Sequence, residues 1–108
     1  MKLRKRYLIF LVKSPLTHSN SEINKAIKRE LKRTFGEKYL ALSGVELVEY
    51  DEKKNIGVLR CYHNYLELVR ASLALVTNIG GSPAALYVLK ATGTRKKAIR
   101  IISSYPLQ

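Results

Sequence analysis

The sequence is poor in cysteine and histidine, and this shortage excludes two kinds of chemistry. Its one cysteine, Cys61, has no partner for an internal disulfide, and His18 and His63 stand far apart in the chain. No Cys/His cluster therefore has the spacing of a metal site. A chain without disulfides suits a reducing compartment, so we expect a cytoplasmic protein that binds no metal of its own.

Long hydrophobic runs are also missing. No stretch approaches the roughly 18 uncharged apolar residues of a membrane span, and we expect no membrane segment. The basic start of the chain followed by Tyr7 to Val12 imitates a secretion signal, but this apolar stretch is six residues long and Lys13 ends it. We therefore predict a first strand here rather than a signal.

Catalytic signatures are a third absence. The sequence contains no G-x-S-x-G, no P-loop, no H-E-x-x-H and no deaminase motif. Glu46, Glu49, Asp51 and Glu52 are the carboxylates that a metal-assisted nuclease would need, and a small nuclease stays open as a hypothesis. Acids in a strand and turn amid basic neighbours are more typical of surface ion pairs. We predict no catalytic residue in the polypeptide and interpret His63 as structural.

What the sequence has in excess is positive charge. Its 108 residues include 20 Lys and Arg against 8 Asp and Glu, a net charge of +12 at neutral pH. Basic surfaces attract polyanions, so nucleic acid is the first class of partner. A solubilising lysine bias and an anionic membrane surface are the alternatives, and the lack of tryptophan weakens the second. With 46% apolar residues, residues 1–108 should fold as one domain.

The first half of the chain predicts a strand, a helix and the start of a hairpin. Residues 4–12 form the first strand. A helix follows from a capping box at Ser19 and Glu22 and ends at Gly36, which suits the left-handed position after a last turn. One face of this helix is basic, and whether it binds a polyanion or is only solvated stays open. Its residues are Lys25, Lys28, Arg29, Lys32 and Arg33.

A hairpin comes next in the pattern. Apolar and acidic residues alternate over residues 45–49, as in a half-buried strand. Residues 50–55 form a polar turn, and residues 56–62 form the partner strand. Gly57 marks either a bulge or a close approach of another group.

The last third predicts a helix, a strand and a short helix. The more buried second helix begins at Asn64, with Glu67 as its third-position acid. Residues 79–83 stop it, residues 84–89 form the fourth strand, and the last helix runs from residue 94 to about residue 102. This order favours an α+β, two-layer, ferredoxin-like or RNA-recognition-motif-like β-α-β-β-α-β fold with an additional C-terminal helix.

The first strand is apolar on both faces, so the sheet face opposite the two helices needs a cover. The C-terminal helix through Ile99 and Ile102, a protein partner, and RNA bases stacked on aromatic side chains are the candidates. The stacking aromatics of the RNA-recognition motif are replaced here by Val58 and Leu59. Positive charge without a stacking platform favours recognition of phosphates and shape in a folded RNA.

The basic residues cluster at two ends of the chain. We predict that RNA phosphates are bound by both clusters and by one residue of the third strand. The predicted RNA-binding residues are Lys2, Arg4, Lys5, Arg6, Arg60, Arg95, Lys96, Lys97 and Arg100.

Several segments, taken together and in order, resemble the archaeal ribonuclease P protein component 2 family, which is related to a subunit shared by eukaryotic ribonucleases P and MRP. The resemblance covers nearly the whole chain. It rests on Arg4-Lys5-Arg6-Tyr7-Leu8, on Gly57-Val58-Leu59-Arg60 followed by Tyr65, on the run from Leu68 to Val76, and on Ile79 to Gly81 followed by Gly93-Thr94.

This resemblance implies a subunit of the ribonucleoprotein that removes the 5′ leader from precursor tRNA. It implies that the RNA component carries the Mg²⁺-dependent active site and that the protein has no catalytic residue. The implied partners are ribonuclease P RNA, precursor tRNA in the assembled complex, a barrel-type protein subunit, and a second copy of this chain within a heterotetramer. A basic ribosomal or tRNA-binding module without a ribonuclease P role is the alternative function.

Overall fold

The computed structural model describes residues 3–106, and its centre is one antiparallel sheet. Strand β1 (Lys5–Lys13) lies between β3 (Ile56–Tyr62) and β6 (Ala85–Thr92), and β2 (Glu46–Asp51) forms the edge beyond β3. This β2-β3-β1-β6 order is the strand order of the ferredoxin-like fold, so the predicted fold class is confirmed. Lys2, a predicted RNA-binding residue, lies outside the described residues.

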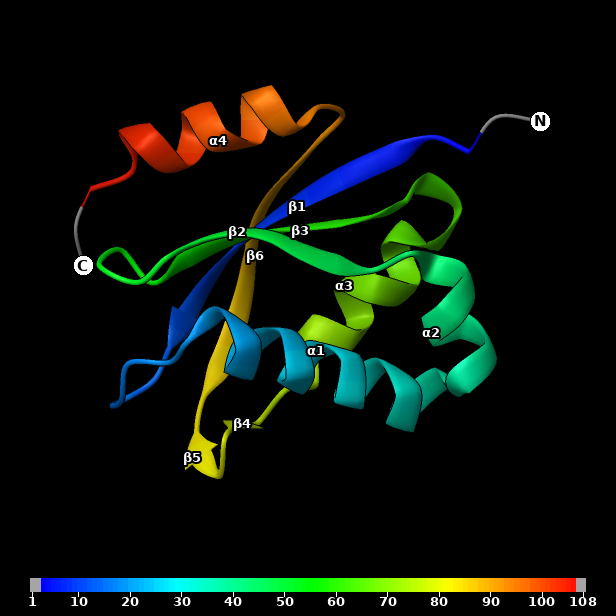
Figure 1. The fold of residues 1–108 in the computed structure, drawn as a ribbon, viewed down its shortest axis with the longest axis horizontal. Coiled ribbons are helices and arrows are strands. Elements are labelled where there is room, and N and C mark those ends of the chain that lie inside the picture. Colours follow the sequence, from blue (N-terminus) through cyan, green and yellow to red (C-terminus); the bar gives the residue numbers. More distant parts are fainter. Residues whose placement is uncertain (1–2, 107–108) are drawn as a thin grey trace.

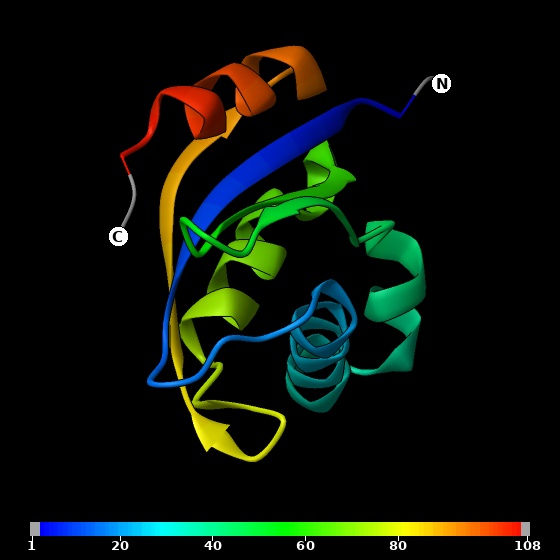
Figure 2. The same cartoon turned by 60° about the vertical axis from the view of Figure 1, so that its left-hand side comes forward.

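The helices lie on both sides of the sheet (Figure 1). Helices α1 (Asn20–Phe35), α2 (Glu37–Ser43) and α3 (Leu66–Ala74) are on one side, and α4 (Arg95–Ser104) crosses the opposite side. The rotated view in Figure 2 shows α4 and α1 separated by the sheet. Among the described residues, no helix has both the length and the apolar character needed to cross a membrane.

Helix α1 begins at the predicted capping box. The Ser19 hydroxyl accepts a hydrogen bond from the Glu22 amide (3.2 Å), and the Glu22 carboxylate accepts one from the Ser19 amide (3.0 Å). Gly36 ends the helix at φ 97°, a conformation that favours glycine. The buried face repeats every three to four residues. Its members are Ile23, Ala26, Ile27 and Leu31.

Two boundaries differ from the sequence-based prediction around the second half of the sheet. Asn64 is not a cap: it lies in a 3-10 turn (His63–Tyr65), and α3 begins at Leu66 without a side-chain cap. Strand β6 continues past Leu89 to Thr92 and stays paired with β1. It can do so because the register shifts by one extra residue of β6 opposite Ile9 and Phe10. The extra residue breaks the alternation that marks a strand in the sequence.

Two short elements were not predicted at all. Helix α2 fills the connection before Gly44, and its one buried residue is Ser43, so the segment has no apolar stripe to reveal it. The segment that was predicted to end the second helix, α3 in the structure, forms a small hairpin of β4 (Asn78–Ile79) and β5 (Ser82–Pro83). Gly80 and Gly81 turn it with φ values of 58° and 84°, which explains the glycine pair.

The main core lies between the sheet and α1 and α3. Leu8, Phe10 and Val12 point into it from β1, with Leu59 and Cys61 from β3. Gly57 supplies the predicted close approach, because a Cβ there would lie 2.7 Å from Phe10 Cζ. Burial of each such side chain contributes about 1.5–3 kcal/mol before the entropy cost is counted.

A smaller apolar cluster lies on the other face, beneath α4. Ala98 and Ile102 cover Ile9, Ile56 and Val58. The predicted C-terminal helix therefore covers this face of the sheet, but the buried residue beside Ile102 is Ala98 and not the predicted Ile99. A helix repeats every 3.6 residues, so residues 98 and 102 lie on the same side of α4.

Candidate RNA-binding surface

A groove between α4 and β6 gathers cations from three elements. It has a volume of about 440 Å³, and we call it the α4–β6 groove. Its charged lining is positive throughout and comes from β1, β6 and α4; the lining residues are Arg6, Lys90, Ala91, Thr92, Gly93, Lys97, Arg100 and Ile101. Four cations, with no Asp or Glu beside them among the described lining residues, form a site suited to phosphate groups.

The local fold explains why these side chains meet. Thr94 caps α4 by accepting a hydrogen bond from the Lys97 amide (3.2 Å). With Ala98 held against the sheet, Lys97 and Arg100 are directed toward the β6 side and line the groove. The Arg6 side chain is held in position because its Nε donates a hydrogen bond to the Thr92 carbonyl (3.2 Å). The groove therefore depends on strand pairing between β1 and β6.

Lys90 is the groove residue that the sequence-based reasoning missed. The predicted fourth strand ended at Leu89, which left Lys90 in a presumed loop. In the structure Lys90 pairs with Ile9 in the sheet and is exposed. A strand drawn through to Thr92 would have placed this cation beside Arg6, so the strand boundary was the missing signal.

Three other predicted residues lie outside the lining of the α4–β6 groove. Arg4 is exposed just before β1, and its carbonyl accepts a hydrogen bond from the His63 amide (2.7 Å). Lys96 is exposed on α4 outside the groove lining. Arg95 has a structural contact: its guanidinium donates to the Val48 carbonyl (3.1 Å) and lies 3.5 Å from the Glu49 carboxylate. Arg95 therefore anchors α4 to the edge strand β2.

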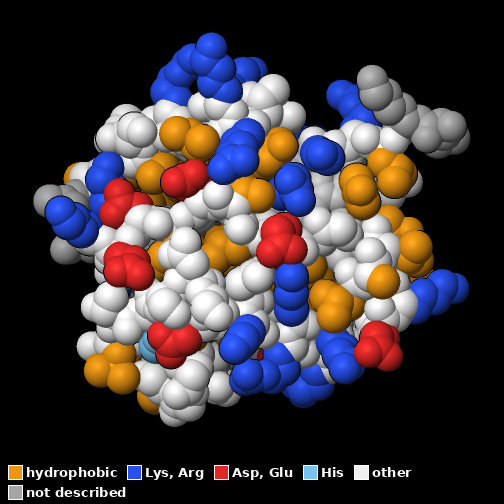
Figure 3. Space-filling model, in the orientation of Figure 1, with side chains coloured by type: hydrophobic (Ala, Val, Ile, Leu, Met, Phe, Trp, Pro, Cys, Tyr) orange, Lys and Arg blue, Asp and Glu red, His pale blue; other side chains and the backbone are white. Residues whose placement is uncertain are grey.

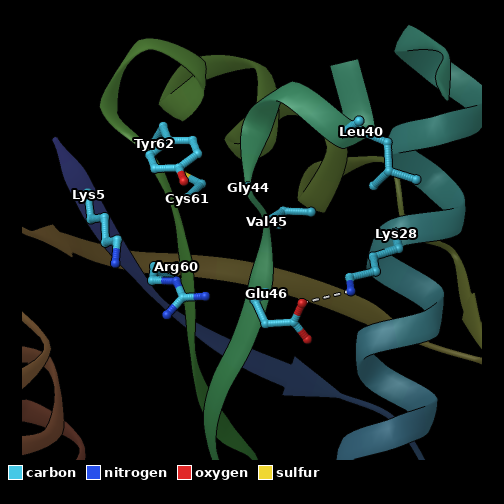
Figure 4. Close-up of a pocket in the computed structure, with 10 residues that line it drawn as sticks. Lys5, Lys28, Leu40, Gly44, Val45, Glu46, Arg60, Cys61 and Tyr62 are labelled. Atoms are coloured by element: carbon cyan, nitrogen blue, oxygen red, sulfur yellow. Dashed lines mark hydrogen bonds and ion pairs between the residues drawn. The ribbon is translucent and has the colours of Figure 1, made fainter. Parts of the chain in front are cut away.

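Lys5 and Arg60 line a second hollow, which we call the α2–β3 hollow (Figure 4). Its volume is about 400 Å³. It opens between the start of β1, the end of β3 and the connection from α2 to β2, and its lining mixes charged and apolar groups. The lining residues are Lys5, Lys28, Leu40, Ala41, Gly44, Val45, Glu46, Arg60, Cys61 and Tyr62.

Glu46 is the acid of this hollow. Its carboxylate accepts hydrogen bonds from Lys28 Nζ (2.9 Å) and Asn24 Nδ2 (3.2 Å). The Lys28 hydrogen bond and charge, with smaller effects of Asn24 and Arg60, hold the pKa of Glu46 below its usual value of 4.5. Glu46 is therefore ionised at neutral pH and neutralises Lys28.

The basic face of α1 is partly neutralised in the same way. Lys28 pairs with Glu46, Lys32 Nζ lies 3.4 Å from Glu37 Oε1, and Arg33 Nη2 lies 2.6 Å from Glu30 Oε2. Figure 3 shows Lys and Arg side chains gathered over α1 along the lower edge and over α4 at the top, with carboxylates between them.

The nuclease hypothesis requires carboxylates that converge. Glu46 is paired with Lys28, Glu49 with Arg95, and Asp51 Oδ1 accepts hydrogen bonds from the backbone amides of the following turn. Within residues 3–106 no three His, Cys, Asp or Glu side chains come together as metal ligands would. The arrangement of these acids is that of ion pairs and turn contacts.

The two remaining reactive side chains have structural surroundings. Cys61 is buried in the main core, and burial raises the pKa of its thiol to about 11, so it is a neutral thiol at neutral pH. His63 lies where β3 ends, with its Nδ1 3.4 Å from an Arg6 guanidinium nitrogen. Cys61 thus belongs to the main core, and His63 contacts Arg6 of the groove.

Comparison with known proteins identifies the family. The Rpp14/Pop5 family model matches residues 6–102. Ribonuclease P protein component 2 of Pyrococcus furiosus is 37% identical over 97 residues, covering 90% of this chain and 81% of the relative. The protein of the same name from Archaeoglobus fulgidus is 30% identical over 100 residues, covering 93% and 89%.

A solved structure shares the fold. A chain in the cryo-EM structure of yeast ribonuclease MRP superimposes with a TM-score of 0.71 at 12% identity, covering 95% of this chain and 89% of that one. The sequence matches extend over nearly the whole chain, and the family model includes nearly all of β1, all of β6 and most of α4. The chain therefore belongs to the Rpp14/Pop5 family, the family of the archaeal ribonuclease P protein component 2.

Proposed function

We propose that this chain, as the ribonuclease P protein subunit that its family indicates, binds the catalytic RNA and supports removal of the 5′ leader from precursor tRNA. The observation that carries the proposal is the α4–β6 groove, where Arg6, Lys90, Lys97 and Arg100 converge and the lining contains no Asp or Glu within residues 3–106. The chain acts as part of an endoribonuclease holoenzyme, and its relatives carry that enzyme's name.

The physical role of the groove is to lower repulsion within the RNA. Where RNA segments converge, their phosphates repel one another, and bound counterions must be released for a protein cation to take their place. Arg6 is held by the Thr92 carbonyl, so one of the four cations is positioned before RNA arrives. A preorganised cation loses less side-chain freedom on binding than a free one.

The bond-breaking chemistry belongs to the RNA in this proposal. The catalytic Mg²⁺ is bound by the RNA, as the resemblance to the ribonuclease P protein component 2 family implies. The protein binds no cofactor itself. Its further partners are precursor tRNA in the assembled complex, a barrel-type protein subunit and a second copy of this chain in a heterotetramer, all in the cytoplasm.

Reconstitution with ribonuclease P RNA and the other protein subunits tests the proposal. The double variant Lys97→Ala/Arg100→Ala should lower precursor tRNA cleavage at limiting magnesium, and added magnesium should restore part of it by screening the same phosphates. The matched control, Lys32→Ala/Arg33→Ala, removes two cations of α1 that already have acid partners. Equal activity of the two double variants would contradict the role of the groove.

The alternative function, a general basic RNA-binding module, is not favoured by the family match. It predicts that the chain binds RNA without raising ribonuclease P activity. Omission of the subunit from the reconstituted enzyme at low magnesium separates the two, because only a ribonuclease P subunit makes cleavage fall.

A further inference from the structure

The α2–β3 hollow differs from the α4–β6 groove because it joins cations to an apolar wall. Leu40 and Val45 provide aliphatic surface, and the ring of Tyr62 provides aromatic surface. Figure 4 shows the side chains of Tyr62, Lys5 and Arg60 following one another along the end of the sheet. A ligand with both an anionic and a planar apolar part would satisfy both kinds of surface.

The cations of the hollow differ in how closely Glu46 approaches them. Glu46 lies 2.9 Å from Lys28 and stands opposite Arg60 across β2 and β3, and the Arg60 charge contributes to the lowered pKa of Glu46. Within residues 3–106 no salt bridge involves Lys5 or Arg60. These two side chains come from neighbouring strands, since β1 and β3 pair Tyr7 with Arg60 and Lys5 with Tyr62. One phosphate group would therefore meet two cations at the mouth of the hollow.

The aromatic wall is held in place by the backbone of the α2–β2 connection. Gly44 lies in the left-handed region at φ 62°, and a Cβ there would come within 2.5 Å of Tyr62 Cε2. The ring thus packs directly on a glycine that no other residue can replace without moving it. The volume, about 400 Å³, falls in the range of small-ligand pockets, roughly 300–1,000 Å³, and exceeds what a phosphate alone would fill.

We propose that the α2–β3 hollow binds one unpaired nucleotide of RNA. Its phosphate lies at Lys5 and Arg60, and its base lies against Tyr62 and Leu40. This inference rests on the proposed function and specifies the kind of RNA: a loop or bulge, because a base in a duplex stays stacked and cannot enter a hollow. The groove then binds phosphates, and the hollow recognises a splayed base.

The test is a titration of the isotopically labelled chain with adenosine 5′-monophosphate, followed by NMR of the backbone amides. Ribose 5-phosphate serves as the comparison probe because it has the phosphate and sugar but no base. We expect saturating shifts at Gly44, Val45 and Tyr62 with the nucleotide, and weaker binding of ribose 5-phosphate at the same amides.

Two variants test which side chain binds the phosphate and which binds the base. Lys5→Ala should weaken binding of both probes about threefold, the effect of an exposed ion pair, while Lys38→Ala, an exposed cation of α2 outside the hollow, should leave it unchanged. Tyr62→Leu keeps an apolar side chain over Gly44 and should remove the preference for the nucleotide over ribose 5-phosphate. If Tyr62→Leu does not fold, Lys5→Ala and Lys38→Ala still decide the proposal.

Equal affinity for the two probes, or shifts confined to the α4–β6 groove, would overturn the inference. Either result leaves the proposed function intact, because ribonuclease P stimulation is measured separately with the groove variant. If the subunit does not stimulate ribonuclease P while the hollow still binds the nucleotide normally, the proposed function is contradicted instead.

Discussion

Two basic helices of this protein, α1 and α4, have different electrostatic surroundings. On α1, Lys28, Lys32 and Arg33 each lie within 3.4 Å of a carboxylate oxygen. On α4, Lys97 and Arg100 line a groove with Arg6 and Lys90, and no Asp or Glu is among the lining residues in the described part of the chain. Three of the five basic residues predicted on this face of α1 are thus paired with acids, so the fold decides how much of a basic sequence pattern remains unneutralised.

The two helices also differ in how firmly they are packed, and the largest expected effect tests this difference. Leu31 of α1 is fully buried in the main core, so Leu31→Ala should lower the free energy of unfolding by about 3 kcal/mol. Ile102 of α4 belongs to the smaller cluster. Ile102→Ala should cost about 2 kcal/mol, with hydrogen exchange of the α4 amides accelerated first. Urea unfolding and native-state exchange measure both; equal protection of α4 and α1 in Ile102→Ala would contradict the comparison.

The next largest expected effect is on the salt dependence of RNA binding. Lys97→Ala/Arg100→Ala should reduce the slope of log affinity against log salt by about two units, because each phosphate contact contributes about one. Lys32→Ala/Arg33→Ala should reduce it by less than about one unit, since acids already hold these side chains. Fluorescence anisotropy with ribonuclease P RNA at several salt concentrations measures the slopes. Equal slopes for the two variants would remove the distinction between the helices.

Within α4 itself, we expect substitutions of Arg95 and Lys96 to have different effects on stability and on the salt slope. Arg95 contacts the Val48 carbonyl and the Glu49 carboxylate, so Arg95→Ala should destabilise the protein by about 0.5–1 kcal/mol and leave the salt slope unchanged. Lys96 is exposed, and we expect Lys96→Ala to lower the slope without changing stability. Thermal unfolding and the same binding assay check the pair, and a reversed pattern would show that Arg95 binds RNA.

The smallest effect concerns pH. The pKa of Glu46 is lowered below 4.5 in the folded chain, first by the Lys28 hydrogen bond. Its stabilisation is therefore fully present above the unfolded pKa and is lost as pH falls through the lower folded pKa. Because the pair is partly exposed, we expect less than about 1 kcal/mol. Urea midpoints measured between pH 6 and pH 3 should fall less steeply in Glu46→Gln than in the parent chain; parallel curves would contradict this assignment.

Sequence reasoning recovered the elements that carry strong periodic or capping signals. The Ser19–Glu22 box starts α1, and the central strand alternates Leu8, Phe10 and Val12 toward the main core. It missed α2, whose one buried side chain leaves no apolar stripe, and it ended β6 at Leu89, where an extra residue shifts the register. Both errors arise because tertiary pairing compensated for weak local patterning.

The candidate site was recovered in part. Arg6, Lys97 and Arg100 were predicted and meet in the α4–β6 groove, while Lys90 was missed and Arg95 turned out to contact β2. Whether these side chains bind RNA stays a prediction. The sequence names the cations as candidates, but their neutralising partners, such as Glu49 for Arg95, lie far away in the chain.

The sequence by itself determined the fold class and the positive charge, because periodicity, caps and composition are local or additive properties of the chain. The resemblance to the family rested instead on an ordered set of residue segments. Only the tertiary structure decided which cations meet. Arg6 and Lys97 share a groove because β1 pairs with β6 and α4 then folds back over the sheet. Ion pairing likewise depends on distances of a few ångströms between side chains, and residues distant in sequence reach those distances only through packing.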